Sequence, residues 1–192
     1  MLIRQMKEEE YPLLQDFLYQ AIYVPEGAEM PDRSILQLPE LRQYTEQFGQ
    51  KAGDLAFVAE EEGQVVGAAW VRHIHDYGYV EDEMPSLTIS LLDAYSGQGI
   101  GSQLLDGLLA ALRKKKVKGV SLSVSKTNPA YFLYRKFGFR TLRENQEDFV
   151  MVLDFSKNRK KTDGFAFCHL ALTFQRAYNS FENMKWNRRC RS

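Results

Sequence analysis

Cysteine is scarce in this sequence, and long apolar runs are absent from it. Cys168 and Cys190 are its two cysteines among 192 residues, so a disulfide framework is excluded and a reducing cytosol is expected. No apolar run approaches the roughly 20 residues of a membrane-spanning helix. The first residues do not show the basic and then apolar pattern of a secretory signal. These absences favour a cytoplasmic protein with no membrane partner.

Histidine is also rare, which argues against a metal centre. His73 and His75 are spaced to share one face of a strand, and the third histidine, His169, lies far along the chain. A zinc site needs a third and usually a fourth ligand, so no metal is expected. Neither cysteine has an obvious base partner, so neither is a good candidate nucleophile.

The balance of charge differs between the two ends of the chain. Residues 1–155 contain 16 Lys and Arg against 23 Asp and Glu, whereas residues 156–192 contain 9 against 2. The basic run at 113–116 falls in the expected last turn of a helix, where cations complement the helix dipole. Because the body is acidic, we expect no nucleic-acid partner.

Apolar periodicity predicts alternating strands and helices. Strands are expected over 2–6, 86–92, 119–125, 139–144 and 148–155, with a hairpin over 54–74 that turns at Gly63. Helices are expected over 8–22, 39–48, 99–116 and 129–137, the last opened by Asn128 and Pro129. This order predicts an α/β chain with a mixed sheet and helices on both faces.

Three glycines stand together where the helix over 99–116 begins. The bend that leads into that helix has no side chains at Gly97, Gly99 and Gly101. Such a bend lets the backbone approach a ligand, and a helix start presents unpaired N–H groups that bind phosphates. The P-loop pattern and the dinucleotide-binding GxGxxG pattern both fail here, and a plain strand-to-helix turn is the alternative.

A second segment, "NPAYFLYRKFGF" at 128–139, complements the bend. Together the two stretches resemble the GNAT superfamily of N-acetyltransferases, which typically has Arg/Gln-x-x-Gly-x-Gly/Ala and later Asn…Leu-Tyr-x-x-x-Gly-Phe. Gly99, Ile100 and Gly101 match the first motif, and the second is matched by Asn128, Leu133, Tyr134, Gly138 and Phe139. The family's Arg/Gln position holds Ser96, so less cationic charge faces a pyrophosphate.

The resemblance implies a GNAT fold with a mixed, mostly antiparallel seven-stranded sheet over 1–155. It also implies an enzyme that transfers acetyl from acetyl-CoA to a small-molecule or peptide amine by direct attack, with no metal. A non-catalytic acyl-CoA-binding module is the alternative. The residues implied in cofactor binding come from the fourth strand, the bend and the later motif: Ile89, Leu91, Leu92, Gly97, Gln98, Gly99, Ile100, Gly101, Ser102 and Asn128.

Tyr134 is the residue that the resemblance assigns to catalysis. A phenol can donate a proton to a departing thiolate, while a core tyrosine is the alternative role. The amine must also lose a proton, at a cost of roughly 4–5 kcal/mol for a lysine-like ammonium at pH 7. Candidate bases are His73, His75 and the acidic run Glu81, Asp82 and Glu83, none of which has a motif behind it.

Two further segments allow more than one interpretation. The loop over 23–38 corresponds to the acceptor side in the family, where Tyr19, Tyr23 and Glu26 would line the site, or it is an ordinary connection. The basic extension over 156–192 carries an apolar stripe at helical spacing. This extension would pack against residues 1–155, mediate a homodimer or not belong to the fold.

Overall fold

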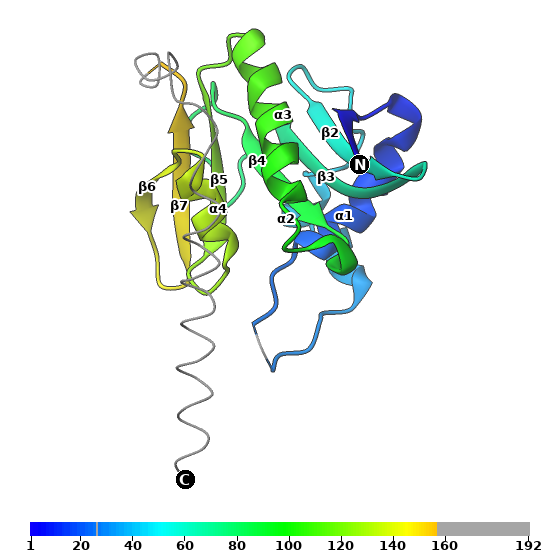
Figure 1. Cartoon of the computed structure of the whole chain (residues 1–192). Coiled ribbons are helices and arrows are strands. Elements are labelled where there is room, and N and C mark those ends of the chain that lie inside the picture. Colours follow the sequence, from blue (N-terminus) through cyan, green and yellow to red (C-terminus); the bar gives the residue numbers. More distant parts are fainter. Residues whose placement is uncertain (26, 157–192) are drawn as a thin grey trace, which may run out of the picture. The chain divides into compact units, whose positions relative to one another are not determined.

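The computed structural model describes residues 1–25 and 27–156 (Figure 1). Its strands are β1 (Leu2–Gln5), β2 (Leu55–Glu61), β3 (Gln64–Arg72), β4 (Ser86–Leu91), β5 (Gly119–Ser125), β6 (Arg140–Glu144) and β7 (Asp148–Asp154). Its α-helices are α1 (Leu14–Ala21), α2 (Pro39–Arg42), α3 (Ile100–Lys114) and α4 (Ala130–Lys136). Three short 3₁₀ helices are η1 (Glu8–Leu13), η2 (Arg33–Gln37) and η3 (Asp93–Tyr95).

The strands form one seven-stranded sheet in the order β1-β2-β3-β4-β5-β7-β6. Every neighbouring pair is antiparallel except β4 and β5, which are parallel. The β2–β3 hairpin turns at Glu62 and Gly63, whose positive φ angles of 52° and 81° suit a tight two-residue turn. The mixed, mostly antiparallel sheet expected from the sequence is therefore confirmed.

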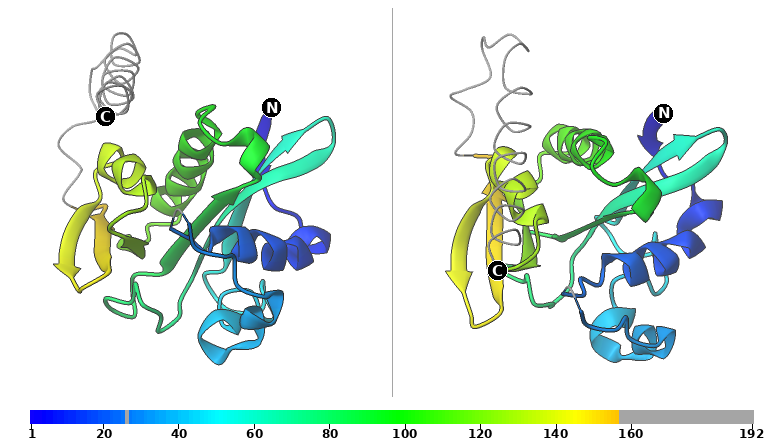
Figure 2. Two further views of the ribbon diagram at one scale, coloured as in Figure 1. Left: turned by 90° about the horizontal axis from the view of Figure 1, so that it is seen from below. Right: turned by 60° about the horizontal axis from the view of Figure 1, so that its bottom comes forward.

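Helices cover both faces of the sheet, and each face has its own apolar core (Figure 2). On one face α3 and α4 bury a cluster that includes Leu104, Leu108 and Tyr134. On the other face α1 packs over Val58 and Trp70, with the segment around α2 at its side. Alternate strand residues supply the two cores, because successive side chains of a strand point to opposite faces.

Two helices are shorter than the sequence predicted. The expected helix over 8–22 begins as the 3₁₀ helix η1, because Pro12 has no N–H to donate and its ring crowds the carbonyl one α-helical turn back. The expected helix over 39–48 ends at Arg42 and continues as turns to Gly49, which has φ +92°. A Cβ on Gly49 would also meet the Tyr11 ring at 2.5 Å.

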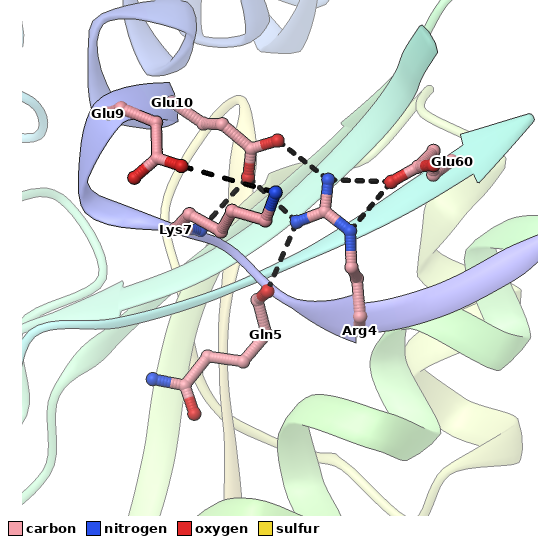
Figure 3. Close-up of polar contacts among 6 residues, drawn as sticks. All are labelled: Arg4, Gln5, Lys7, Glu9, Glu10 and Glu60. Carbon is pink, nitrogen blue, oxygen red and sulfur yellow. Dashed lines mark hydrogen bonds and ion pairs between the residues drawn. The ribbon is translucent and has the colours of Figure 1, made fainter. Parts of the chain in front are cut away.

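A cluster of charged side chains links η1 to β1 and β2 through hydrogen bonds (Figure 3). The Arg4 guanidinium donates to both carboxylate oxygens of Glu10, at 2.7 and 2.6 Å, and to Glu60 at 2.7 Å. The Lys7 backbone N–H also donates to Glu10. These hydrogen bonds, led by that from Arg4, lower the pKa of Glu10 from 4.5 to about 2.

Several expectations lie outside the described residues. They concern Glu26, Cys168, His169, Cys190 and the apolar stripe of the extension after residue 156. Within residues 1–25 and 27–156, no helix has the length and apolar character needed to cross a membrane.

Candidate active site

The sheet opens between its two parallel strands. The pairing of β4 with β5 consists of a single residue pair, Ser86 with Ser121, and the Ser121 N–H donates to the Pro85 carbonyl. By contrast, β4 pairs with β3 along its whole length, from Ser86 to Leu91. The edge of β4 that faces β5 is therefore unpaired beyond Ser86, and the two strands diverge from there (Figure 1).

A cavity of about 420 Å³ occupies this opening. Three consecutive residues of β4, Leu87 to Ile89, line it, as do three consecutive residues of β5, Ser123 to Ser125. Because neighbouring side chains of a strand point to opposite faces, a cavity lined by consecutive residues reaches both faces of the sheet. The opening thus joins the side covered by α3 and α4 to the side covered by α1 and α2.

Tyr134 lines the cavity from helix α4. The residue is 7% exposed, and among the described residues its hydroxyl has no hydrogen-bond partner. Burial raises the pKa of Tyr134 above the ordinary value of a tyrosine, so the phenol stays protonated at neutral pH. The Tyr134 oxygen is not among the fully buried side-chain atoms that lack a partner, so this hydroxyl is a proton donor that remains accessible from the cavity.

Helix α4 holds this tyrosine in place through its start and its packing. The Asn128 side chain, which also lines the cavity, accepts a hydrogen bond from the Ala130 N–H at 2.8 Å. This bond satisfies one of the unpaired donors at the helix start, as the sequence predicted. The Tyr134 ring packs against Phe139, with ring centroids 5.6 Å apart.

The glycine bend lies at the start of α3, on the same face of the sheet as Tyr134. Gly97 and Gly99 have φ angles of +75° and +81°, which side-chain-bearing residues rarely adopt. Within the described chain, no oxygen accepts a well-formed hydrogen bond from the backbone N–H groups of residues 97–101. The Ser102 N–H, which we expected to be available, instead donates to the Gly99 carbonyl. The free donors of the bend are therefore those of residues 97–101, without Ser102.

Gly101 differs from the other two glycines because nothing in the described part of the chain requires glycine there. A Cβ at this position would lie 3.6 Å from Leu91 Cδ1 and 3.7 Å from Leu133 Cδ2, which are ordinary contacts. Glycine inside a helix costs about 1 kcal/mol relative to alanine. Packing within the described residues therefore does not explain why this position holds glycine.

The other side of the opening is acidic. Asp76, in the loop after β3, lines the cavity and accepts hydrogen bonds from Tyr44 Oη at 2.7 Å, Ser86 Oγ at 2.7 Å and the Gly78 N–H at 2.9 Å. Burial, followed by the nearby Asp76 charge, raises the pKa of Tyr44. Tyr44 therefore remains a neutral donor and holds the carboxylate in a fixed orientation.

Asp148 is the second carboxylate that lines the cavity. It opens β7 directly opposite Ser125, and residues opposite each other in an antiparallel pair share one face of the sheet. Among the described residues its side chain has no hydrogen bond or ion pair. Sequence reasoning missed Asp76, Asp148 and Tyr44, since each stands alone in its own segment and only the fold brings them together.

A buried ion pair supports the segment that carries Tyr44. The side chains of Arg72 and Asp54 are each 1% exposed, and both Asp54 oxygens lie 3.1 Å from the Arg72 guanidinium. Arg72 also donates to the carbonyls of Gln43, Glu46 and Gln47. The turn that follows α2 is thereby fastened to β3, which fixes one wall of the cavity.

The loop over 23–38 contributes one described residue, Tyr23, to the cavity lining, and its position over the acceptor stays a prediction. Tyr23 donates to the Thr127 carbonyl at 3.0 Å, so it links segments on opposite sides of the opening. Tyr19 does not line the cavity, because its hydroxyl donates to the Pro31 carbonyl.

None of the five candidate bases lines the cavity. His73 and His75 follow the end of β3, and His75 stacks on Tyr79. Glu81 pairs with Lys118, and Asp82 accepts a hydrogen bond from Tyr79. Within the part of the chain that the structure describes, no group of three or more His, Cys, Asp or Glu side chains is arranged to hold a metal.

The residues expected to bind a cofactor separate into two groups. Ile89 and Asn128 line the cavity, whereas Leu91, Leu92 and the bend over 97–102 do not. Leu91 ends β4 and its side chain lies beside the Gly101 backbone, and the Leu92 N–H donates to the Val66 carbonyl. The Gln98 side chain donates to the Ala94 carbonyl.

Comparisons with known proteins agree with this geometry. Residues 52–141 match the model of the acetyltransferase (GNAT) domain. Over 79 residues the chain is 37% identical to the [ribosomal protein bS18]-alanine N-acetyltransferase of Haemophilus influenzae, a match that covers 41% of this chain. The match spans 50% of the length of that enzyme.

Two solved structures illustrate the shared fold. A ribosomal-protein-alanine N-acetyltransferase from Brucella melitensis aligns with a TM-score of 0.58 and 24% identity, over 80% of this chain and 99% of that one. A GNAT family acetyltransferase from Brucella melitensis in complex with acetyl-CoA aligns with a TM-score of 0.54 and 27% identity, over 80% and 87%. With the sheet order, these matches lead to one conclusion: the chain has the fold of the GNAT acetyltransferases, and residues 52–141 match the model of their domain.

Proposed function

We propose that this protein transfers the acetyl group of acetyl-CoA to a primary amine, and that the amine is the amino terminus of a protein or peptide. The observation that carries the proposal is the cavity through the sheet, which joins the unpartnered hydroxyl of Tyr134 to an acidic opening on the opposite face. The likeness to a ribosomal-protein alanine N-acetyltransferase supports a polypeptide acceptor.

The residues on the α3 and α4 side fit acetyl-CoA. The free N–H groups of 97–101 suit a pyrophosphate, and Gly101 leaves room beside them. The unpaired edge of β4 next to Ile89 offers backbone groups that an extended pantetheine arm would pair with, as an added strand does. When bound, acetyl-CoA supplies an acetyl group attached to a good leaving group through a thioester.

The reaction needs an acid on one side of the opening and an uncharged amine on the other. The amine nitrogen forms a bond to the acetyl carbon while the carbon–sulfur bond breaks. Tyr134 donates its proton to the departing sulfur, and the proton that the amine releases returns to the phenol through solvent. The products are an N-acetylated amine and a free thiol, so the protein needs no nucleophile of its own.

The test is thiol release from acetyl-CoA with a panel of acceptors, followed by mass spectrometry of the products. The panel contains peptides that begin with alanine, the same peptides with a blocked amino terminus and an internal lysine, and spermidine. We expect acetylation of the free amino termini. Binding of CoA without acetylation of any acceptor would instead support the acyl-CoA-binding module.

A further inference from the structure

The lining of the cavity is acidic and contains no basic side chain. Among the described residues, the two charged side chains of the lining are Asp76 and Asp148, and no Lys, Arg or His lines the cavity. Val124 belongs to the core on the α3 and α4 face, so its neighbours Ser123 and Ser125 point to the face that α1 and α2 cover. Asp148 shares that face, since it lies directly opposite Ser125. Asp76 accepts from Ser86, which points to the same face because its neighbour Leu87 belongs to the α3 and α4 core. Both carboxylates therefore belong to the side from which we expect the acceptor to enter.

The two carboxylates are not equivalent. Asp76 accepts from three donors and is oriented by them, so it acts as a fixed negative charge. Asp148 is half-buried and has no side-chain partner among the described residues, so its oxygens are available to a ligand. An available carboxylate in a cavity that also holds the unpartnered Tyr134 hydroxyl is a site for a cation that donates hydrogen bonds.

Building on the function proposed above, we propose that this cavity selects primary ammonium groups that carry no carboxylate on the neighbouring carbon. Asp148 binds the incoming ammonium, which then loses one proton to solvent before the uncharged amine attacks. The amino terminus of a peptide has this chemistry, because its neighbouring carbonyl is an amide. A free amino acid does not, since its carboxylate would lie beside Asp76 and Asp148 with no cation of the lining to neutralise it.

The experiment compares alaninamide with alanine as acceptors in the wild-type protein and in Asp148→Asn. The two amines differ in basicity, but this difference cancels when the ratio of their kcat/KM values is compared between variants. We expect Asp148→Asn to lower the preference for alaninamide about tenfold, the scale of losing a hydrogen bond between charged groups. Asp148→Glu should restore most of the preference.

Glu147→Gln is the matched control, since Glu147 is the exposed neighbour of Asp148 and does not line the cavity. It should keep the wild-type ratio of the two kcat/KM values.

Two further acceptors, an alanylalanine peptide amide and spermidine, distinguish two sources of the same ammonium chemistry. The first represents a polypeptide terminus and the second a polyamine. An unchanged ratio in Asp148→Asn, or a wild-type preference for alanine, would overturn the proposal.

A binding measurement separates this proposal from the function on which it rests. Alaninamide is titrated calorimetrically into the protein saturated with CoA, where no transfer occurs. Weaker binding to Asp148→Asn than to wild type supports the ammonium site even if no acceptor is acetylated, which would count against the transferase activity alone. Equal binding to both proteins overturns the assignment of Asp148.

Discussion

The two sides of the β4–β5 opening are assembled from the chain in different ways. The side with α3 and α4 comes from one stretch, residues 97–134, in which the glycine bend, β5 and Tyr134 follow one another. The side with α1 and α2 takes Tyr44, Asp76 and Asp148 from three separate segments. A contiguous stretch leaves a motif in the sequence, whereas a side assembled from distant segments leaves none.

This difference explains how far the sequence could predict the molecule. The strands, the hairpin turn at Gly63 and the Asn128 cap follow from local patterns, and the structure contains them. The candidate bases were the acidic run at 81–83, which directly precedes the fourth strand, and two histidines expected on the third strand, and all of them lie outside the cavity lining. Asp148 lines the cavity because β7 pairs with β5, and the sequence does not show which strands pair.

Loss of the buried Arg72–Asp54 ion pair, which supports the side of the opening covered by α1 and α2, should lower the stability of the protein most. Arg72→Met leaves the Asp54 carboxylate buried without its partner, so we expect a loss of about 3–5 kcal/mol in the free energy of unfolding, measured by urea denaturation. Arg42→Met removes the exposed pair with Glu46 and should change it by less than about 0.5 kcal/mol. Equal stability of the two variants would show that the buried pair does not hold this side together.

Tyr134→Phe tests the group that faces the opening from the cofactor side. It keeps the ring and removes the proton donor, so kcat should fall by about 10²–10³ while affinity for acetyl-CoA stays unchanged. Because burial raises the pKa of Tyr134, the alkaline limb of the rate profile should be the same in both proteins. Tyr131→Phe, one turn earlier on α4 and outside the cavity lining, is the control. Wild-type kcat in Tyr134→Phe, with chemistry rate-limiting, would return this residue to a structural role.

Two substitutions of Gly101 distinguish an effect on stability from an effect on ligand binding on the α3 and α4 side. Gly101→Ala should raise the free energy of unfolding by up to about 1 kcal/mol, because alanine favours the helix and its Cβ fits. Gly101→Val should weaken acetyl-CoA binding about tenfold by intruding beside the free N–H groups. Calorimetry measures the affinity of both folded variants. Unchanged affinity in Gly101→Val would mean that no ligand uses this space.

The charged cluster at η1 lies outside both sides and should give the smallest effect. The pKa of Glu10 is lowered to about 2, so its contribution to stability is full above pH 4.5 and is lost as the pH falls toward 2. Glu10→Gln should therefore cost about 1 kcal/mol at pH 7 and almost nothing near pH 2. Thermal unfolding at several pH values measures this. A cost independent of pH would assign the effect to packing.

The measurement that tests the two-sided opening most directly is steady-state kinetics with both substrates varied, on Gly101→Val and Asp148→Asn. If the cofactor and the acceptor reach the opening from opposite faces of the sheet, Gly101→Val should raise the KM for acetyl-CoA alone. Asp148→Asn should raise the KM for the peptide amine alone, and the double variant should combine the two changes independently. A rise in both KM values from either single substitution would contradict the account, since it would place both substrates on one surface.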